Sequence, residues 1–178
     1  MPSRKILDKD RLFDFLDELD KELSKKGKKV TLVAVGGTAM TLLDLKPSTL
    51  DVDFTIPSED YSNFDLVLKV LSPGFKIDMW QDGAVFSQFL PQDYLVKSIE
   101  IKTDFNSLQL RALHPLDIIV TKIGRLNDRD LQDIEVCINQ FGITKKEILD
   151  RAKQVQYAGN ENVYQENLKF ILKKFFQT

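Results

Sequence analysis

Cysteine and histidine are almost absent from this sequence, and their scarcity excludes several kinds of site. Among the 178 residues there is one cysteine, Cys137, and one histidine, His114. A single cysteine cannot form an internal disulfide, so we expect a reducing, cytoplasmic setting. A zinc centre needs more thiol and imidazole ligands than the chain has. Because no nucleophile or acid stands at a telling distance from His114, a hydrolase triad is unsupported, and we interpret this residue as structural.

Long apolar runs and a charge excess of one sign are missing as well. No stretch approaches the roughly 20 apolar residues of a membrane-spanning helix. The N-terminus is charged from Arg4 onward and lacks the apolar segment of a secretory signal. With 25 basic and 27 acidic residues, the net charge is −2. This balance disfavours a nucleic-acid-binding structural protein, which would need a local basic groove.

The apolar residues that are present indicate alternating helices and strands. Their share of 43% is enough for one hydrophobic core. Helical spacing predicts a helix over 8–26 that Asp8 caps, a short helix over 38–44 and a helix over 58–71. Strands are expected at 30–35, 51–56 and 75–80, and residues 84–90, 95–103 and 107–113 are β-rich.

From Pro115 onward the pattern is helical to the end of the chain. Asp128 is expected to cap one helix, Thr144 and Glu147 form a capping box for the next, and a last helix covers 161–176. The prediction is therefore an α/β (α+β) fold, with a mixed sheet of about five strands flanked by helices and a C-terminal helical subdomain. No proline- or glycine-rich linker separates the expected core, 1–113, from the helical region, 114–178.

The most informative pattern pairs a glycine turn with two aspartates. A buried strand ends at Gly36, Gly37 and Thr38, where a phosphate can approach backbone without Cβ atoms. A threonine hydroxyl there can cap the next helix or contact the phosphate. On a strand, Asp51 and Asp53 would share a face about 7 Å apart, close enough for a metal pair. Either motif alone is most often a plain turn or a solvated strand end.

A third acid would complete such a metal site. Asp78 lies between apolar residues on an expected strand, and Glu100 has the same surroundings. Burying an unpaired carboxylate is costly, so a group in that position usually has a partner or a metal. Both residues can also be the solvent face of an amphipathic strand. We prefer Asp78 as the third acid, with Glu100 as its rival.

Two charged pairs follow in the helical region. Lys122 and Arg125 are three residues apart on a helix and therefore share a face that could hold a triphosphate. Asp130 and Asp133 share a face of the next helix. Taken alone, the first pair is an ordinary charged surface and the second an acidic helix N-terminus.

Both regions resemble the nucleotidyltransferase superfamily. The first block is Gly36-Gly37-Thr38-Ala39-Met40 followed by Lys46-Pro47-Ser48-Thr49-Leu50-Asp51-Val52-Asp53-Phe54. The second is Leu113-His114-Pro115-Leu116-Asp117-Ile118-Ile119-Val120-Thr121-Lys122, then Arg125, then Arg129-Asp130-Leu131-Gln132-Asp133-Ile134. The most similar branch contains toxins of the AbiE abortive-infection type. The resemblance covers about residues 30–140, and both blocks in order are more specific than either one.

The resemblance implies a Mg²⁺-dependent enzyme that transfers a nucleoside monophosphate from an NTP to an acceptor hydroxyl. Two Mg²⁺ ions would be held by Asp51, Asp53 and Asp78. The nucleotide-binding residues implied are Gly36, Gly37, Thr38, Ser48, Thr49, Lys122 and Arg125, with Asp130 and Asp133 in support. The acceptor can be RNA, a protein or a small molecule, and an antitoxin is a possible partner. The alternative is a non-catalytic module of the same fold that binds a nucleotide or a partner protein.

Overall fold

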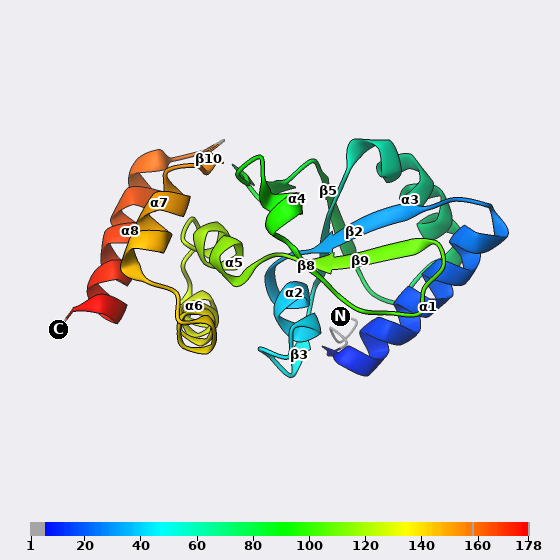
Figure 1. Cartoon of the computed structure of the whole chain (residues 1–178), viewed down its shortest axis with the longest axis horizontal. Helices are drawn as coiled ribbons and strands as arrows, with labels where there is room; N and C mark the ends of the chain where they lie inside the picture. The colour runs from blue at the N-terminus through cyan, green and yellow to red at the C-terminus, as the bar shows by residue number, and fades with distance from the viewer. Residues whose placement is uncertain (1–5, 158, 178) are drawn as a thin grey trace.

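A five-stranded mixed sheet forms the centre of the molecule (Figure 1). The computed structural model describes residues 6–157 and 159–177. Residues 1–5, 158 and 178, which belong to the two predicted regions, lie outside the described residues. The strand order is β5-β4-β2-β9-β8. The strands are β2 (Val30–Ala34), β4 (Val52–Ile56), β5 (Ile77–Gln81), β8 (Ile99–Glu100) and β9 (Leu108–Ala112). The pairs β4–β5 and β2–β9 are parallel, whereas β2–β4 and β8–β9 are antiparallel.

Three helices pack around this sheet as the sequence predicts. They are α1 (Lys9–Lys25), α2 (Gly36–Leu42) and α3 (Ser58–Leu71). Asp8 caps α1 by accepting a hydrogen bond from the backbone N–H of Arg11 at 3.0 Å. Helices α1 and α3 pack against each other and against β9 and β2, respectively. All five residues of β4 are buried, as is typical of a strand that is covered on both faces.

The segment between β5 and β9 differs in part from the prediction. It contains β6 (Ala84–Val85) and β7 (Gln88–Phe89), the short helix α4 (Tyr94–Lys97) and β8. The prediction of β structure over 95–103 is therefore wrong for its first residues, because the backbone forms helical hydrogen bonds from Lys97 and Ser98 back to Asp93 and Tyr94. Strands β6 and β7 join β10 (Gln156–Tyr157) in a small separate sheet. Another pairs β1 (Leu7–Asp8) with β3 (Ser48–Thr49).

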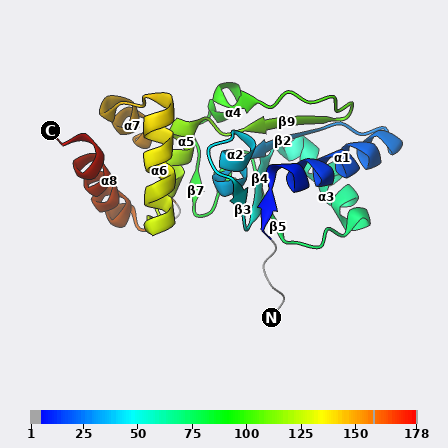
Figure 2. The ribbon, with the colours of Figure 1, turned by 90° about the horizontal axis from the view of Figure 1, so that it is seen from below.

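The helices after Pro115 gather at one end of the molecule (Figures 1 and 2). They are α5 (Pro115–Lys122), α6 (Asp128–Phe141), α7 (Lys145–Ala152) and α8 (Glu161–Phe176). The predicted capping box of Thr144 and Glu147 is confirmed. The cap expected from Asp128 is wrong: Asn127 caps α6, because its side chain accepts from the N–H of Asp130 while Asp130 accepts from the N–H of Asn127. The division of the chain at 113/114 stays a prediction.

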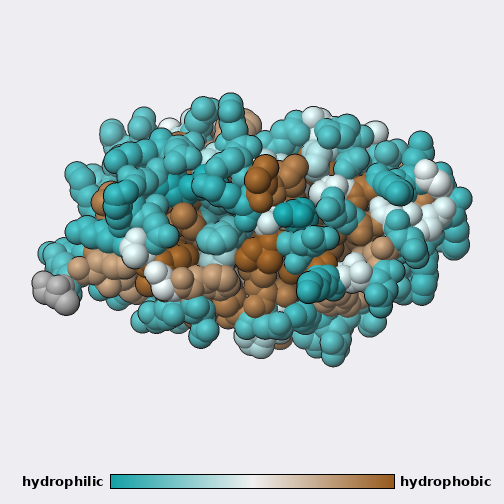
Figure 3. All heavy atoms as spheres, in the orientation of Figure 1, coloured by the Kyte–Doolittle hydropathy of each residue, from teal (hydrophilic) through white to brown (hydrophobic). Residues whose placement is uncertain are grey.

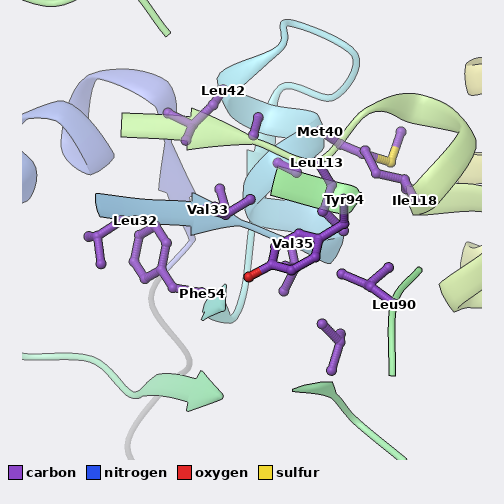
Figure 4. Close-up of a cluster of buried hydrophobic side chains, with 14 of the residues drawn as sticks. Leu32, Val33, Val35, Met40, Leu42, Phe54, Leu90, Tyr94, Leu113 and Ile118 are labelled. Carbon is purple, nitrogen blue, oxygen red and sulfur yellow. The ribbon is translucent and has the colours of Figure 1, made fainter. Parts of the chain in front are cut away.

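One hydrophobic core joins the sheet to α1, α2, α3, α4 and the C-terminal helices, and Figure 4 shows the part of it around Val35. Val33, Phe54 and Leu113 are fully buried there, beside Tyr94 from α4. His114 is structural, as expected: it precedes Pro115, and its Nδ1 accepts a hydrogen bond from the N–H of Leu116 at 3.1 Å. The face in Figure 3 is mostly hydrophilic, with hydrophobic residues near its middle. Among residues 6–157 and 159–177, no helix combines the length and apolar character needed to span a bilayer.

Candidate active site

An open cleft of about 660 Å³ lies where the aspartates of the sheet face the helical end of the molecule. Its walls come from β3, from the start of β4 and β5, and from α5 and α6. Most of the residues singled out in the sequence line it: Gly37, Ser48, Thr49, Asp51, Asp53, Asp78, Lys122, Arg125, Asp130 and Asp133. The fold therefore brings together two sequence blocks, of which the first ends at Phe54 and the second begins at Leu113.

Three acids meet on one wall of the cleft. Asp53 on β4 stands directly opposite Asp78 on the parallel strand β5. Asp53 is 6% exposed, whereas Asp78 is half-buried and Asp51 is exposed. The alternation predicted that Asp51 lies on the strand, and this is wrong. Because β4 begins at Val52, Asp51 lies in the bend just before it. The bend places Asp51 at the rim of the cleft and leaves Asp53 deeper.

The buried carboxyl group of Asp53 has an unusual pKa. Burial, followed by the negative charges of Asp78 and Asp51, raises the pKa of Asp53 to about 7, and the charges of Arg125 and Lys76 only partly oppose this. The carboxylates repel one another because they carry like charges on one wall of the cleft. A cation at this wall would relieve the repulsion.

The donor set suits a hard cation, but the three acids do not yet surround one point. Within the described residues, no group of three or more histidine, cysteine, aspartate or glutamate side chains is arranged to hold a metal ion. Asp78 is instead paired with Lys76, whose Nζ lies 2.6 Å from its Oδ1. Mg²⁺ in nucleotide enzymes is usually held by one or two carboxylates together with water and substrate phosphates. Two such carboxylates, Asp51 and Asp53, line the cleft, whereas Asp78 is engaged by Lys76.

The structure separates the two candidates for the third acid. Glu100 lies on β8, at the opposite edge of the sheet from β5, and opens to a different surface hollow. Its strand partner is Arg111, not one of the aspartates. Asp78, and not Glu100, is therefore the acid that accompanies Asp53.

The glycine turn supports the acid wall directly. Gly36 has a φ of +54°, in the left-handed region that favours glycine, and a Cβ built there would lie 3.6 Å from Oδ2 of Asp53. Gly37 faces the cleft, and a Cβ there would come within 2.7 Å of the hydroxyl of Thr49. That hydroxyl donates to the carbonyl of Asp51 at 2.8 Å. Gly37 thus allows the turn to lie close to the aspartate segment, whereas Gly36 provides the left-handed backbone of the turn.

Thr38 is placed differently from the prediction. It does not cap α2, whose first turn follows Val35 without a side-chain cap. The Thr38 hydroxyl is buried, donates to the carbonyl of Asp51 at 3.1 Å and accepts from the N–H of Asp53 at 3.0 Å. Because these two bonds occupy it, the hydroxyl positions the acids instead of facing the cleft.

The opposite wall carries charges that are already paired. The Nζ of Lys122 lies 3.0 Å from Oδ1 of Asp130 and 2.8 Å from Oδ2 of Asp133, and all three side chains are buried. Arg125 donates two hydrogen bonds to Asp130, at 2.9 and 2.8 Å. Burial acts to raise the pKa of Asp130, but Arg125 and Lys122 lower it to about 2. These contacts join α5 to α6, and the supporting role of the two aspartates in the site stays a prediction.

Several cleft residues were not assigned from the sequence. Lys46 belongs to the first block, and its Nζ lies 3.1 Å from Oδ1 of Asp133. Lys76 pairs with Asp78 two residues away, a same-face spacing that could have indicated the contact. Phe86 and Arg129 also line the cleft, and no local pattern indicates them. The walls include five cationic residues (Lys46, Lys76, Lys122, Arg125, Arg129) and five aspartates, so the cleft is not a basic groove.

Comparison with known proteins points to one fold and one family. The model of the family "Nucleotidyltransferase of unknown function (DUF6036)" matches residues 10–177. A search among curated proteins found no match. The crystal structure of ANT(2″)-Ia in complex with adenylyl-2″-tobramycin is 12% identical, with a TM-score of 0.56, and the alignment covers 79% of this chain and 94% of that one. An antigenic nucleotidyltransferase-like protein from Paracoccidioides brasiliensis is 17% identical, with a TM-score of 0.58 and coverage of 96% and 91%. These likenesses confirm the predicted fold class.

Proposed function

The chain belongs to a family of nucleotidyltransferases whose function is unknown, and we propose that it transfers a nucleoside monophosphate from an NTP to an acceptor hydroxyl in a Mg²⁺-dependent reaction. The observation that carries this proposal is the wall of three aspartates in the cleft. Asp53 has a pKa of about 7 there because it is buried beside two other acids. Such perturbed groups cluster where a protein binds a cation or performs chemistry.

The residues of the cleft divide the work between them. Asp51 and Asp53, joined by Asp78, would hold Mg²⁺, which when bound supplies charge neutralisation and Lewis-acid polarisation of phosphate oxygens. The half-buried backbone of Gly37 and the hydroxyl groups of Ser48 and Thr49 border the position proposed for the phosphates.

On the other wall, we propose that Arg125 contacts a phosphate. Its side chain is 59% exposed although it is bonded to Asp130. Lys122 is 7% exposed and bonded to two carboxylates. It therefore holds Asp130 and Asp133 in place instead of contacting a phosphate. We propose that Asp78, released from Lys76, takes the proton of the acceptor hydroxyl.

The charge of the cleft bears on the acceptor. Five cations and five aspartates on its walls give no excess of positive charge for a polyanion such as RNA. We therefore propose a small hydroxyl-bearing molecule or a protein side chain as the acceptor. ANT(2″)-Ia, seen with adenylyl-2″-tobramycin, has a related fold, which makes tobramycin one acceptor to include in a test.

The test is a transfer assay with purified protein, Mg²⁺, each of the four labelled NTPs and a panel of acceptors. The panel contains tobramycin, tRNA, a protein mixture and the protein itself. We expect label to pass from one NTP to one acceptor class, and pyrophosphate to appear in equal amount. Transfer that continues unchanged after Asp53→Ala would remove the proposed site.

A second candidate function is nucleotide or partner binding without turnover. The arrangement that favours it is the pairing of Asp78 with Lys76, which leaves the metal-binding group incomplete among the described residues. Mg²⁺-dependent binding of an NTP without product from any acceptor would support it. The AbiE-type branch, a toxin role, an antitoxin partner and a cytoplasmic setting stay predictions from the sequence.

A further inference from the structure

The turn between β6 and β7 carries a phenylalanine in a conformation that favours glycine. Val85 and Gln88 pair across the two strands, so Phe86 and Ser87 form a two-residue hairpin loop. Phe86 has a φ of +55°, in the left-handed region. Hairpin loops that need a positive φ at their first residue usually place glycine or a small polar residue there, and a bulky side chain is an outlier. Residues held in such conformations cluster at functional sites.

The side chain of Phe86 lies between the two walls of the cleft. It is 46% exposed and lines the cleft, although it is apolar. Its ring centre lies 5.0 Å from the ring centre of Trp80 on β5 and 5.4 Å from Cζ of Arg125, in the loop between α5 and α6. Trp80 follows Asp78 by two residues on the same strand. Phe86 therefore connects the strand that carries Asp78 to a cation of the opposite wall.

Asp130 holds only one edge of the Arg125 guanidinium. Nε and Nη2 of Arg125 donate to the two carboxylate oxygens of Asp130, at 2.9 and 2.8 Å. The Arg125 side chain is nevertheless 59% exposed. Two hydrogen bonds along one edge leave the guanidinium plane free to tilt about that edge, whereas an aromatic ring against its face restricts the tilt and attracts the cation. The ring of Phe86 occupies that second position.

We infer that Phe86 is a positioning residue, whose ring fixes the plane of the Arg125 guanidinium so that Nη1 of Arg125 is directed at the triphosphate. This role rests on the proposed function, in which Arg125 contacts a phosphate. Nη1 is the end of the guanidinium that Asp130 does not engage, and it carries two N–H donors. A glycine in place of Phe86 would relax the turn but would leave the guanidinium without a contact on that face.

Two other roles for Phe86 predict different results. If its ring only packed on Trp80 to hold the hairpin, its replacement would lower the stability of the protein and leave its affinity for phosphates unchanged. If the ring contacted the nucleotide itself, its replacement would weaken the binding of NTPs but not of tripolyphosphate, which has no rings. Only a role through Arg125 predicts a loss of affinity for both ligands that depends on the guanidinium.

The test measures the binding of the four NTPs and of tripolyphosphate by calorimetry in Mg²⁺. Phe86→Leu keeps an apolar side chain without a ring, and we expect it to weaken tripolyphosphate and the preferred NTP alike, by about threefold, the size of an exposed cation–π contact. Phe86→Tyr keeps the ring and should bind like the original protein. Phe89→Leu is the matched control, since Phe89 lies on the same hairpin, is 49% exposed and lines a different surface hollow. Its affinities should not change.

The same measurements in Arg125→Met identify the residue through which Phe86 acts. Phe86→Leu should have no further effect in that protein, because no guanidinium is left to position. If tripolyphosphate binds too weakly to measure, this cycle on the preferred NTP decides. Should Phe86→Leu fold poorly, Phe86→Met, which also has an apolar side chain without a ring, takes its place.

The outcomes separate the positioning role from the proposed function. Normal affinities in Phe86→Leu, a loss confined to NTPs, an equal loss in Phe86→Tyr, or a loss that persists in Arg125→Met would each overturn the positioning role. The proposed function stands in all four cases, provided that the original protein binds an NTP in Mg²⁺. If the original protein binds no NTP, the proposed function fails and the role of Phe86 fails with it.

Discussion

The two walls of the cleft carry aspartates in opposite electrostatic states. On the sheet side, Asp53 lies beside Asp51 and Asp78, and its pKa is raised to about 7. On the helical side, Asp130 is more deeply buried, yet its pKa is lowered to about 2. Burial penalises the charged form at both places, so the difference comes from the neighbours.

The cluster around Asp130 is charge-balanced by the protein alone, whereas the cluster around Asp53 is not. Around Asp130, two cations and the N–H of Asn127 satisfy the carboxylate, and the result is a closed structural contact between α5 and α6. Around Asp53, the nearest charges are other acids, and the group stays under-compensated until a cation arrives. The paired cluster around Asp130 stabilises the fold, whereas the cluster around Asp53 destabilises it. Such a destabilising arrangement is expected at a functional site.

The largest difference should appear in activity. Asp53→Asn keeps the shape of the side chain but removes the charge, and we expect transfer to fall roughly 100-fold or more, because a charge that binds the cation is lost. Initial rates at saturating NTP and Mg²⁺ measure the effect. Glu100→Gln is the matched control at the opposite edge of the sheet. Equal losses in both variants would contradict the placement of the site.

A substitution in the helical wall should lower the free energy of unfolding. Asp130→Ala leaves Lys122 buried with one partner fewer, and breaking such a buried pair costs about 3–5 kcal/mol of unfolding free energy. Urea unfolding followed by circular dichroism measures it. Asp128→Ala, at an exposed position of the same helix end, should cost well under about 1 kcal/mol. A small effect of Asp130→Ala would mean that the two walls do not differ as described.

The pH dependence separates the walls more finely. The raised pKa of Asp53 means that the folded protein binds this proton more tightly than the unfolded chain does. The contribution of the protonated Asp53 to the free energy of unfolding is therefore fully present below about pH 4 and is lost as pH rises through about 7. Between pH 5 and 8, we expect the original protein to lose about 2–3 kcal/mol relative to Asp53→Asn. Thermal unfolding of both proteins across this range gives the difference. Parallel curves would show that Asp53 titrates normally.

The smallest expected effect concerns the support of the acid wall. Thr38→Val keeps the shape of the buried side chain but removes the hydroxyl that the N–H of Asp53 bonds, which should cost about 1–2 kcal/mol. Chemical unfolding measures the loss, and an accompanying fall in kcat without a change in KM for NTP would identify a positioning role. Thr103→Val is the control away from the cleft: its hydroxyl accepts only a long bond, 3.4 Å, from the N–H of Phe105, so we expect a smaller loss of stability and an unchanged kcat.

Much of the fold follows from local patterns. The caps at Asp8 and Thr144, the strand ending before Gly36 and the last helix were all predicted from spacing and capping chemistry. The segment after β5 was less predictable, because very short strands and the four-residue helix α4 depend on distant partners such as β10. Helix α6 shows the limit of local rules: either Asn127 or Asp128 can cap, and the tertiary contact of Asp130 with Lys122 accompanies the choice of Asn127.

By itself the sequence determined that a glycine turn and an aspartate pair would stand near each other, because both are local motifs joined by one short helix. It also predicted that Lys122 and Arg125 share one helical face and that Asp130 and Asp133 share a face of the next helix. Only the tertiary structure decided that Asp78, and not Glu100, lies beside Asp53, because strand order in a sheet is set by packing between distant segments. The same packing placed Gln88 of β7 opposite Tyr157 of β10, since neither residue's neighbours in the sequence reveal what lies across the sheet.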